Sequence, residues 1–199
     1  MAEARPDRDL VRLAQSGDAE AFEELFQRYH KAIYNIVYRL LGNPEDASDL
    51  TQDAFVNAFR ALKSLRDPGI FYPWVRQIAV NLSRNQHKRA TRVRVHSLDD
   101  TTRTEEGEQL SRELPDWSPG PSEELEDREL QERIAEAIAT LSPDHRAVVT
   151  LHHLEDVPVA EVADMLGISV GTVKSRLARA RDRLARRLRG YVEPEEVTK

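Results

Sequence analysis

Residues 170–189 combine side chains that bind DNA with the spacing of a single helix. Asp182 is the only acidic residue of the stretch. Arginine and lysine pair with phosphates and with guanine edges, and the major groove of DNA is wide enough to hold an α-helix. The other non-apolar residues include Thr172, Lys174, Ser175, Arg176, Arg179, Arg181, Arg183, Arg186, Arg187 and Arg189. The stretch predicts a DNA-binding helix; the simpler alternative is an amphipathic helix with a solvated basic face.

Two features of the neighbouring sequence would position such a helix. Val162, Ala163 and Leu166 stand at helical spacing and predict a short first helix. Gly167 follows, a residue type that readily takes a positive φ at a helix end, and Ser169 can cap the next helix. The second helix has its own apolar stripe, formed by Val173, Leu177, Ala180, Leu184 and Leu188. Together these signals favour a helix-turn-helix over a simple charged surface.

The composition bounds the class of protein. The chain has 199 residues and no cysteine, and it lacks β-branched runs at period two, so we expect an all-α protein without disulfides or thiolate metal sites. No apolar run approaches the ~20 residues of a membrane span, and the N-terminus carries no export signal. This predicts a cytoplasmic protein with no membrane insertion. We identify no nucleophile paired with a base, no phosphate-cradling glycine loop and no metal-ligand cluster, and therefore expect no enzyme activity, cofactor or metal.

Charge is strongly segregated along the chain. The formal net charge is -6, which is unusual for a protein that binds DNA. Positive residues collect at Arg84–Arg94 and along the last long helix, whereas negative residues collect between Asp99 and Glu136. Local fields decide contact with a polyanion, because salt screens charges beyond ~10 Å. The net charge therefore does not exclude nucleic acid as a partner.

Hydrophobic periodicity predicts two small helical domains. Residues 1–94 form an N-terminal helical domain. Residues 95–121 are rich in Ser, Thr, Asp, Glu, Pro and Gly, and are expected to be a flexible acidic linker. Residues 122–190 form a four-helix unit that ends in the helix-turn-helix, and 191–199 form a tail.

The N-terminal domain contains a second candidate for DNA binding. A loop is expected at residues 65–73, where two prolines and a glycine interrupt the helical pattern. Ile70, Phe71 and Tyr72 are adjacent there, and aromatic residues in a loop beside a basic helix can stack on an unpaired base. The alternative, for any one of them, is that it fills the core. The next helix is expected to open at Trp74 and ends in clustered positive charge.

Three stretches, in this order, resemble the extracytoplasmic-function (ECF) group of bacterial RNA polymerase sigma factors in the sigma-70 family. They are DASDLTQDAFVNAFRAL, FYPWVRQIAVNLSRN and EVADMLGISVGTVKSRLARAR. The resemblance covers both domains. It implies a promoter-specificity subunit that binds core RNA polymerase, recognises the -35 and -10 elements of promoter DNA and helps to melt the DNA. It also implies an anti-sigma factor as a partner, although no residue here indicates one by itself.

The resemblance gives each stretch a role. The face toward the coiled coil of the polymerase's largest subunit would comprise Asp49, Gln52, Asp53 and Asn57. The part that opens and reads the -10 element would comprise Leu65, Arg66, Phe71, Tyr72, Trp74, Asn81, Arg84 and Lys88. In the -35 reader, base or near-base contacts would come from Lys174, Ser175 and Arg179. Contacts to phosphates or to the fold would come from Thr172, Arg176 and Arg181.

Two other classes remain as alternatives. A free-standing dimeric helix-turn-helix regulator would be a homodimer on a palindromic site. A helical adaptor with an incidental basic tail would show no salt-dependent DNA binding, even beside polymerase.

Overall fold

The computed structural model describes residues 5–97, 130 and 133–192, with only the backbone for 87–97 and 190–192. The described residues form helices joined by short turns, with no strand among them, which confirms the all-α class. Most of the expected linker (95–121) and of the tail (191–199) lies outside the described residues, as does the beginning of the expected C-terminal unit.

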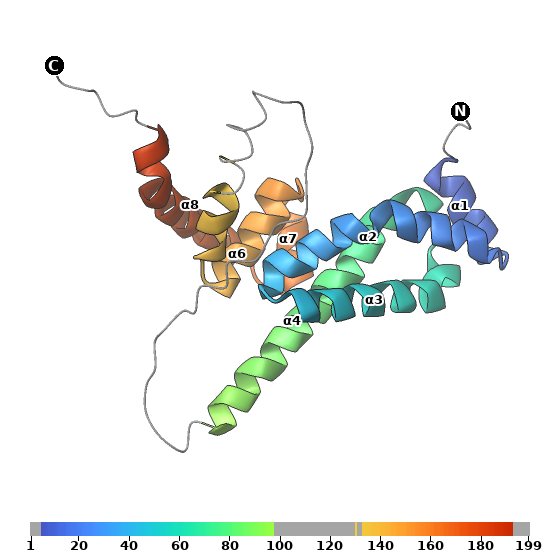
Figure 1. Ribbon diagram of the computed structural model, residues 1–199, viewed down its shortest axis with the longest axis horizontal. Coiled ribbons are helices and arrows are strands. Elements are labelled where there is room, and N and C mark those ends of the chain that lie inside the picture. Colours follow the sequence, from blue (N-terminus) through green and yellow to red (C-terminus); the bar gives the residue numbers. More distant parts are fainter. Residues whose placement is uncertain (1–4, 98–129, 131–132, 193–199) are drawn as a thin grey trace.

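Four α-helices and two short 3-10 turns build the N-terminal domain (Figure 1). They are α1 (Asp7–Gln15), α2 (Ala19–Leu41), α3 (Pro44–Ala61), η1 (Leu62–Ser64), η2 (Pro68–Ile70) and α4 (Phe71–Ser97). Local chemistry explains the boundaries. The Asp18 carboxylate accepts the amides of Glu20 and Ala21 at 3.0 and 3.1 Å and so caps α2. Gly42, at φ +77°, ends α2, and the Asn43 side chain caps α3.

The C-terminal domain is also built from helices joined by short turns. It contains a helix at residues 133–139, then α6 (Pro143–Val149), a π-helical turn η3 (Thr150–Leu154), α7 (Val159–Leu166) and α8 (Val170–Val192). The helix-turn-helix predicted from the sequence therefore corresponds to α7 and α8. No described helix is both long and apolar enough to cross a lipid bilayer.

Two expected boundaries differ from the structure. The helix α4 begins at Phe71 instead of Trp74, because the fully buried Phe71 side chain draws this part of the loop into the first helical turn. Pro73 fits there, since the first turn of a helix needs no amide donor. At its other end α4 continues to Ser97, three residues beyond the expected end of the domain at 94.

The two domains pack directly on each other. The middle of α4 lies beside α7, and the end of α2 lies beside α6 (Figure 1). Their buried apolar residues belong to one continuous cluster. At the α2–α6 contact, a Cβ at position 42 would meet the Arg146 guanidinium at 3.1 Å, so Gly42 permits this approach as well as ending its helix.

Candidate nucleic-acid interface

The turn between α7 and α8 is fixed by backbone geometry. Gly167 takes φ +62°, and its amide donates to the Asp164 carbonyl at 3.2 Å. The next amide, of Ile168, donates to the Ala163 carbonyl at 3.0 Å, which completes a Schellman motif at the end of α7. Ser169 Oγ then accepts the Thr172 amide at 3.1 Å, as the sequence predicts for an N-cap. These bonds set the direction in which α8 leaves the turn.

One side of α8 is buried and the other is basic. Val173, Leu177 and Ala180 are at most 5 % exposed. The predicted -35 contacts Lys174, Ser175, Arg179 and Arg181 are exposed, whereas Thr172 and Arg176 are half-buried. The first half of α8 therefore presents a line of polar and cationic side chains that a DNA groove could receive.

Arg176 has a partner within the domain. Its Nη2 lies 2.6 Å from Asp144 Oδ2 on α6. Thr172 is also engaged locally, since its hydroxyl lies 2.8 Å from Ser169 Oγ. Both residues therefore have partners within the domain, which is compatible with the expected role in support of the fold, and the expected phosphate contacts stay a prediction.

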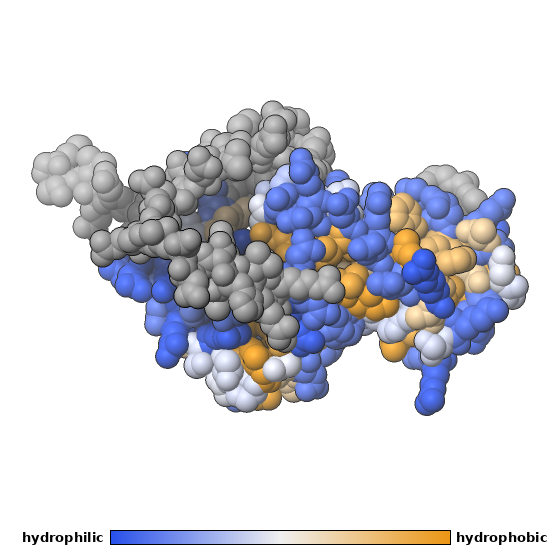
Figure 2. All heavy atoms as spheres, turned by 90° about the horizontal axis from the view of Figure 1, so that it is seen from below, coloured by the Kyte–Doolittle hydropathy of each residue, from blue (hydrophilic) through white to orange (hydrophobic). Residues whose placement is uncertain are grey.

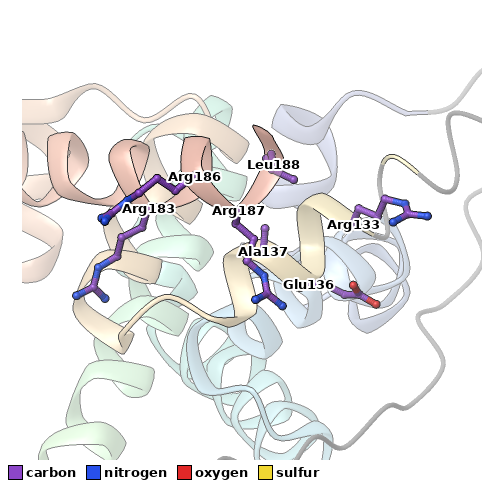
Figure 3. Close-up of a pocket in the computed structure, with 7 residues that line it drawn as sticks. All are labelled: Arg133, Glu136, Ala137, Arg183, Arg186, Arg187 and Leu188. Atoms are coloured by element: carbon purple, nitrogen blue, oxygen red, sulfur yellow. The ribbon is translucent and has the colours of Figure 1, made fainter. Parts of the chain in front are cut away.

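The basic surface continues along α8 into a groove of about 650 Å³ (Figure 3). Its lining consists of Arg133, Glu136, Ala137, Arg183, Arg186, Arg187 and Leu188. Arg133 and Glu136 lie at one end of the view, and Arg183 and Arg186 at the other. Four guanidinium groups and one carboxylate make this groove a region of positive potential.

The surroundings of a histidine beneath α8 predict that the stability of this domain depends on pH. Burial lowers the pKa of His145, and the charges of Arg183 and Arg176 lower it further, against the effect of Asp144. An unfolded imidazole titrates near pH 6.5, so acid protonates the unfolded chain first and the free energy of unfolding falls below about pH 6.5. We expect the urea midpoint of unfolding to fall between about pH 7.5 and 5, and less so in His145→Gln. An identical pH profile in the variant would contradict this role.

The predicted polymerase-binding stripe lies on the outer face of α3. Asp49, Gln52 and Asp53 are exposed and Asn57 is half-buried. Gln52 also borders a groove of about 210 Å³ between α2 and α3. The structure thus leaves these side chains accessible to a partner.

Sequence reasoning missed two apolar neighbours of this stripe. Val56 and Phe59 are 45 % and 54 % exposed, and Phe59 contacts the ring of Phe22 at 4.9 Å between centroids. Hydrophobic residues reach the surface over the N-terminal domain in Figure 2. The signal was available, because Gln52, Val56 and Phe59 share one face at helical spacing outside the buried stripe.

The residues expected at the -10 element divide into three groups. Leu65 and Phe71 are buried, at 6 % and 0 % exposure. Arg66 is exposed, and the side chains of Tyr72, Trp74, Asn81 and Arg84 are half-buried. The side chain of Lys88 lies outside the described residues. In this arrangement Leu65 and Phe71 hold the loop to the core, so their side chains are not available to a base.

Two of the half-buried residues are turned toward the C-terminal domain. Tyr72 Oη donates to Glu155 Oε2 at 2.7 Å, and Arg84 Nη1 donates to the Met165 carbonyl at 3.4 Å. Burial raises the pKa of Glu155, an effect that the Tyr72 hydrogen bond and the cations Arg76 and Arg39 oppose. Burial and the bond to Glu155 likewise raise the pKa of Tyr72. Sequence reasoning missed Arg76 and Glu155, because their pairing depends on how the domains dock.

Two regions of the sigma-70 family match the chain, one in the N-terminal domain and one in the C-terminal domain. Sigma-70 region 2 matches residues 25–93, and sigma-70 region 4 matches residues 131–184. The first range holds α3 and most of α4, and the second holds α7 and most of α8.

Known sigma factors are similar over most of the chain. The ECF RNA polymerase sigma-E factor of Escherichia coli (strain K12) is 34% identical over 182 residues, which cover 92% of this chain and 94% of that protein. The ECF RNA polymerase sigma factor SigE of Mycolicibacterium smegmatis is 33% identical over 173 residues, which cover 85% of this chain and 63% of that protein.

Solved structures show the same fold. CnrH in complex with the cytosolic domain of CnrY is 26% identical, with a TM-score of 0.56, over 93% of this chain and 98% of CnrH. The sigma factor RpoE of Bartonella quintana, solved with the anti-sigma factor NepR, gives a TM-score of 0.63 over 87% of this chain and 99% of that one. Its identity of 21% supports likeness of fold alone.

Proposed function

Because the chain belongs to the extracytoplasmic-function group of sigma-70 RNA polymerase sigma factors, we propose that it directs core RNA polymerase to promoters through two separate DNA-reading surfaces. The observation that carries this proposal is the exposed basic side of α8, with its apolar side buried and its N-terminus held by the glycine turn and the Ser169 cap. A helix so mounted enters the major groove with its first turns toward the bases. Its partner is the -35 element.

Within α8 the contacts divide by exposure. Lys174, Ser175 and Arg179 read bases or their immediate surroundings, and Arg181 contacts a phosphate. Arg176 supports the fold through its ion pair with Asp144.

The -10 element is read by the N-terminal domain. Its contacts come from Arg66, Tyr72, Trp74, Asn81, Arg84 and Lys88, with the exposed Ile70 as an addition from the same loop. Removing a base from its stack costs a few kcal/mol, and stacking on an aromatic side chain returns about 1–3 kcal/mol per base. Tyr72 and Trp74 are the aromatic residues of this set that keep partial exposure. Leu65 and Phe71 act indirectly by fixing the loop.

Core polymerase binds the outer face of α3. Asp49, Gln52, Asp53 and Asn57 supply polar contacts to the coiled coil of the largest subunit, and Val56 and Phe59 add apolar area beside them. Exposed apolar residues next to polar ones are common in protein interfaces.

This face gives a direct test of the proposed function. Gln52→Ala and Asp53→Ala should each weaken binding to core polymerase by about 5- to 30-fold, the effect of losing about 1–2 kcal/mol at an interface. Fluorescence anisotropy of the labelled chain titrated with core polymerase measures this. Asp9→Ala, which removes an exposed carboxylate from α1, is the matched control and should bind as the unmodified chain does. Equal affinities for all variants would refute this assignment of the face.

The remaining partners follow from relatives. Two solved neighbours were captured with a second protein: CnrH with the cytosolic domain of CnrY, and RpoE with the anti-sigma factor NepR. An anti-sigma factor is therefore the regulator that we assign to this chain. We further propose that the chain acts in the cytoplasm, as a binding subunit without enzyme activity or cofactor. The alternative of a free-standing dimeric regulator predicts a homodimer, which sedimentation would detect.

A further inference from the structure

The helix α1 holds the loop that precedes α4 through a single glutamine side chain. Gln15 Nε2 donates to the Leu62 carbonyl and to the Leu65 carbonyl, each at 2.9 Å, so both N–H groups of the amide are used. These carbonyls stand at the two ends of the connection from α3, since η1 is Leu62–Ser64 and the loop begins at Leu65. In Figure 1, α1 lies at the end of the domain where α3 finishes. One side chain of α1 therefore fixes the path by which the backbone leaves α3.

The sequence around Gln15 explains why its side chain reaches the loop. Leu10, Val11 and Ala14 form the buried side of α1. Gln15 stands one residue beyond Ala14 and about one helical turn beyond Val11, and its side chain is half-buried. A polar side chain at the edge of a buried face needs partners, because an amide that loses water without gaining a hydrogen bond destabilises the fold. The two loop carbonyls are those partners.

The carbonyls gain as much from this contact as the glutamine does. The last carbonyls of a helix have no partner within the helix, and after η1 the backbone becomes extended, with Leu65 at φ -71° and ψ 106°. Leu62 and Leu65 are both buried, so water has little access to this turn. Gln15 thus caps the end of α3 from a different helix, 47 and 50 positions away in sequence.

A weaker attachment holds the second half of the loop. The Asp67 carboxylate accepts the Gly69 amide at 2.9 Å and so begins η2. Arg8 of α1 places Nη2 3.8 Å from the same carboxylate, and a Cβ at position 69 would lie 2.7 Å from Arg8 Nε, so Gly69 makes room for the guanidinium. Both charged side chains are more than half exposed, and an exposed ion pair contributes little. The main attachment is therefore that of Gln15.

Between these attachments the loop keeps its outer side open to solvent. Arg66, Gly69 and Ile70 are exposed, whereas Leu65 and Phe71 on either side of them are buried. The backbone is thus held from within, and the exposed side chains remain available to a ligand. A binding loop already held in its bound form gains affinity, because less conformational freedom is lost when the ligand arrives.

We propose that Gln15 is a positioning residue of the -10 reader, which holds residues 65–70 in the form that receives an unpaired base. The inference rests on the proposed function, since that function assigns this loop to the -10 element. It adds α1 to the machinery of promoter reading, although the match to sigma-70 region 2 begins only at residue 25. Gln15 acts through the backbone of the loop and makes no contact with DNA itself.

The test compares the base preferences of holoenzymes reconstituted from core polymerase and variants of the full chain. Each holoenzyme is incubated with a pool of random single-stranded DNA, and the retained molecules are sequenced. Gln15→Leu keeps the approximate size of the side chain and removes both donors. It should lower the preference at one base position about tenfold, as when the positioned form of the loop falls to about one molecule in ten. The preferences at positions read by α4 should stay as in the parent.

Three further variants separate positioning from stability. Gln15→Lys restores N–H donors and should recover most of the preference at that position. Gln15→Asn keeps the amide but is one methylene shorter, so it should lose the preference without adding an apolar group, and it carries the test if Gln15→Leu fails to fold. The matched control is Gln27→Leu, which removes an exposed amide that donates to Glu23 within α2 at 2.7 Å. This control should select the same sequences as the parent.

The pattern of losses decides the outcome. Unchanged preferences at every position in Gln15→Asn would overturn the positioning role. An equal loss at all positions would also overturn it, because that result, together with a lower urea midpoint of unfolding, indicates a general loss of structure. A parent holoenzyme that selects no sequence at all would instead refute the proposed function.

Discussion

Replacing Arg179 with alanine is expected to lower transcription from a -35-dependent promoter by roughly 5- to 150-fold. Arg179 is exposed on α8, on the side opposite Val173 and Leu177, which are buried. A well-placed arginine contact to a base is worth about 1–3 kcal/mol, and this range converts to that loss in rate when promoter binding is limiting. Run-off transcription with reconstituted polymerase, on templates with the intact and the scrambled -35 element, measures the effect.

The control for Arg179→Ala is Arg189→Ala. It removes the same charge from an exposed position near the far end of α8, so it should reduce activity only slightly and equally on both templates. Arg179→Ala should make the two templates nearly equivalent. If Arg179→Ala kept its full preference for the intact element, α8 would not be the -35 reader in the orientation proposed.

Replacing Phe71 with alanine is expected to lower the free energy of unfolding of the N-terminal domain by about 3–5 kcal/mol. The Phe71 side chain is 0 % exposed, and its ring lies 6.3 Å from Phe22 and 6.0 Å from Tyr29 between centroids. Truncation would leave a cavity among these rings. Urea unfolding followed by circular dichroism measures the loss.

The neighbouring Ile70→Ala provides the contrast. Ile70 is 46 % exposed, so its truncation should cost less than about 1 kcal/mol of stability while slowing promoter opening. If Phe71→Ala unfolded at the same urea concentration as the unmodified chain but failed to open promoters, Phe71 would be a base-contacting residue and its placement in the core would be wrong.

The helices could be predicted where local chemistry determines them. The bounds of α2 at Ala19 and Leu41 follow from the Asp18 cap and from Gly42, and both signals are local in sequence. The same holds for the turn at Gly167 and the cap at Ser169, which position α8. These features depend on residues within five positions of one another, so a sequence pattern contains them.

The conformation of the loop before α4 could not be predicted from local sequence in the same way. Phe71 and Tyr72 are adjacent aromatic residues, and the sequence does not show which of them packs in the core and which could contact a base. Their fates differ because the helix starts at Phe71, which turns this ring inward and leaves Tyr72 half-buried at the edge. The start of the helix depends in turn on the burial of Phe71, which is a tertiary effect.

Contacts between the domains could not be predicted from the sequence, because they also depend on tertiary structure. Glu155 and Arg76 are 79 positions apart, and no periodicity relates an acidic residue after η3 to a cation on α4. For Val56 and Phe59, in contrast, the sequence shows helical spacing with Gln52. Their exposure could not be predicted, because it depends on which neighbours cover α3.

The most direct test of the account is transcription of fragmented genomic DNA by core polymerase, with and without this chain, followed by mapping of the transcript starts. We expect the chain to bind core polymerase and to produce starts that share two unlike upstream elements, one for each DNA-reading surface. Failure of the chain to associate with core polymerase, with no new transcript starts, would contradict the central claim.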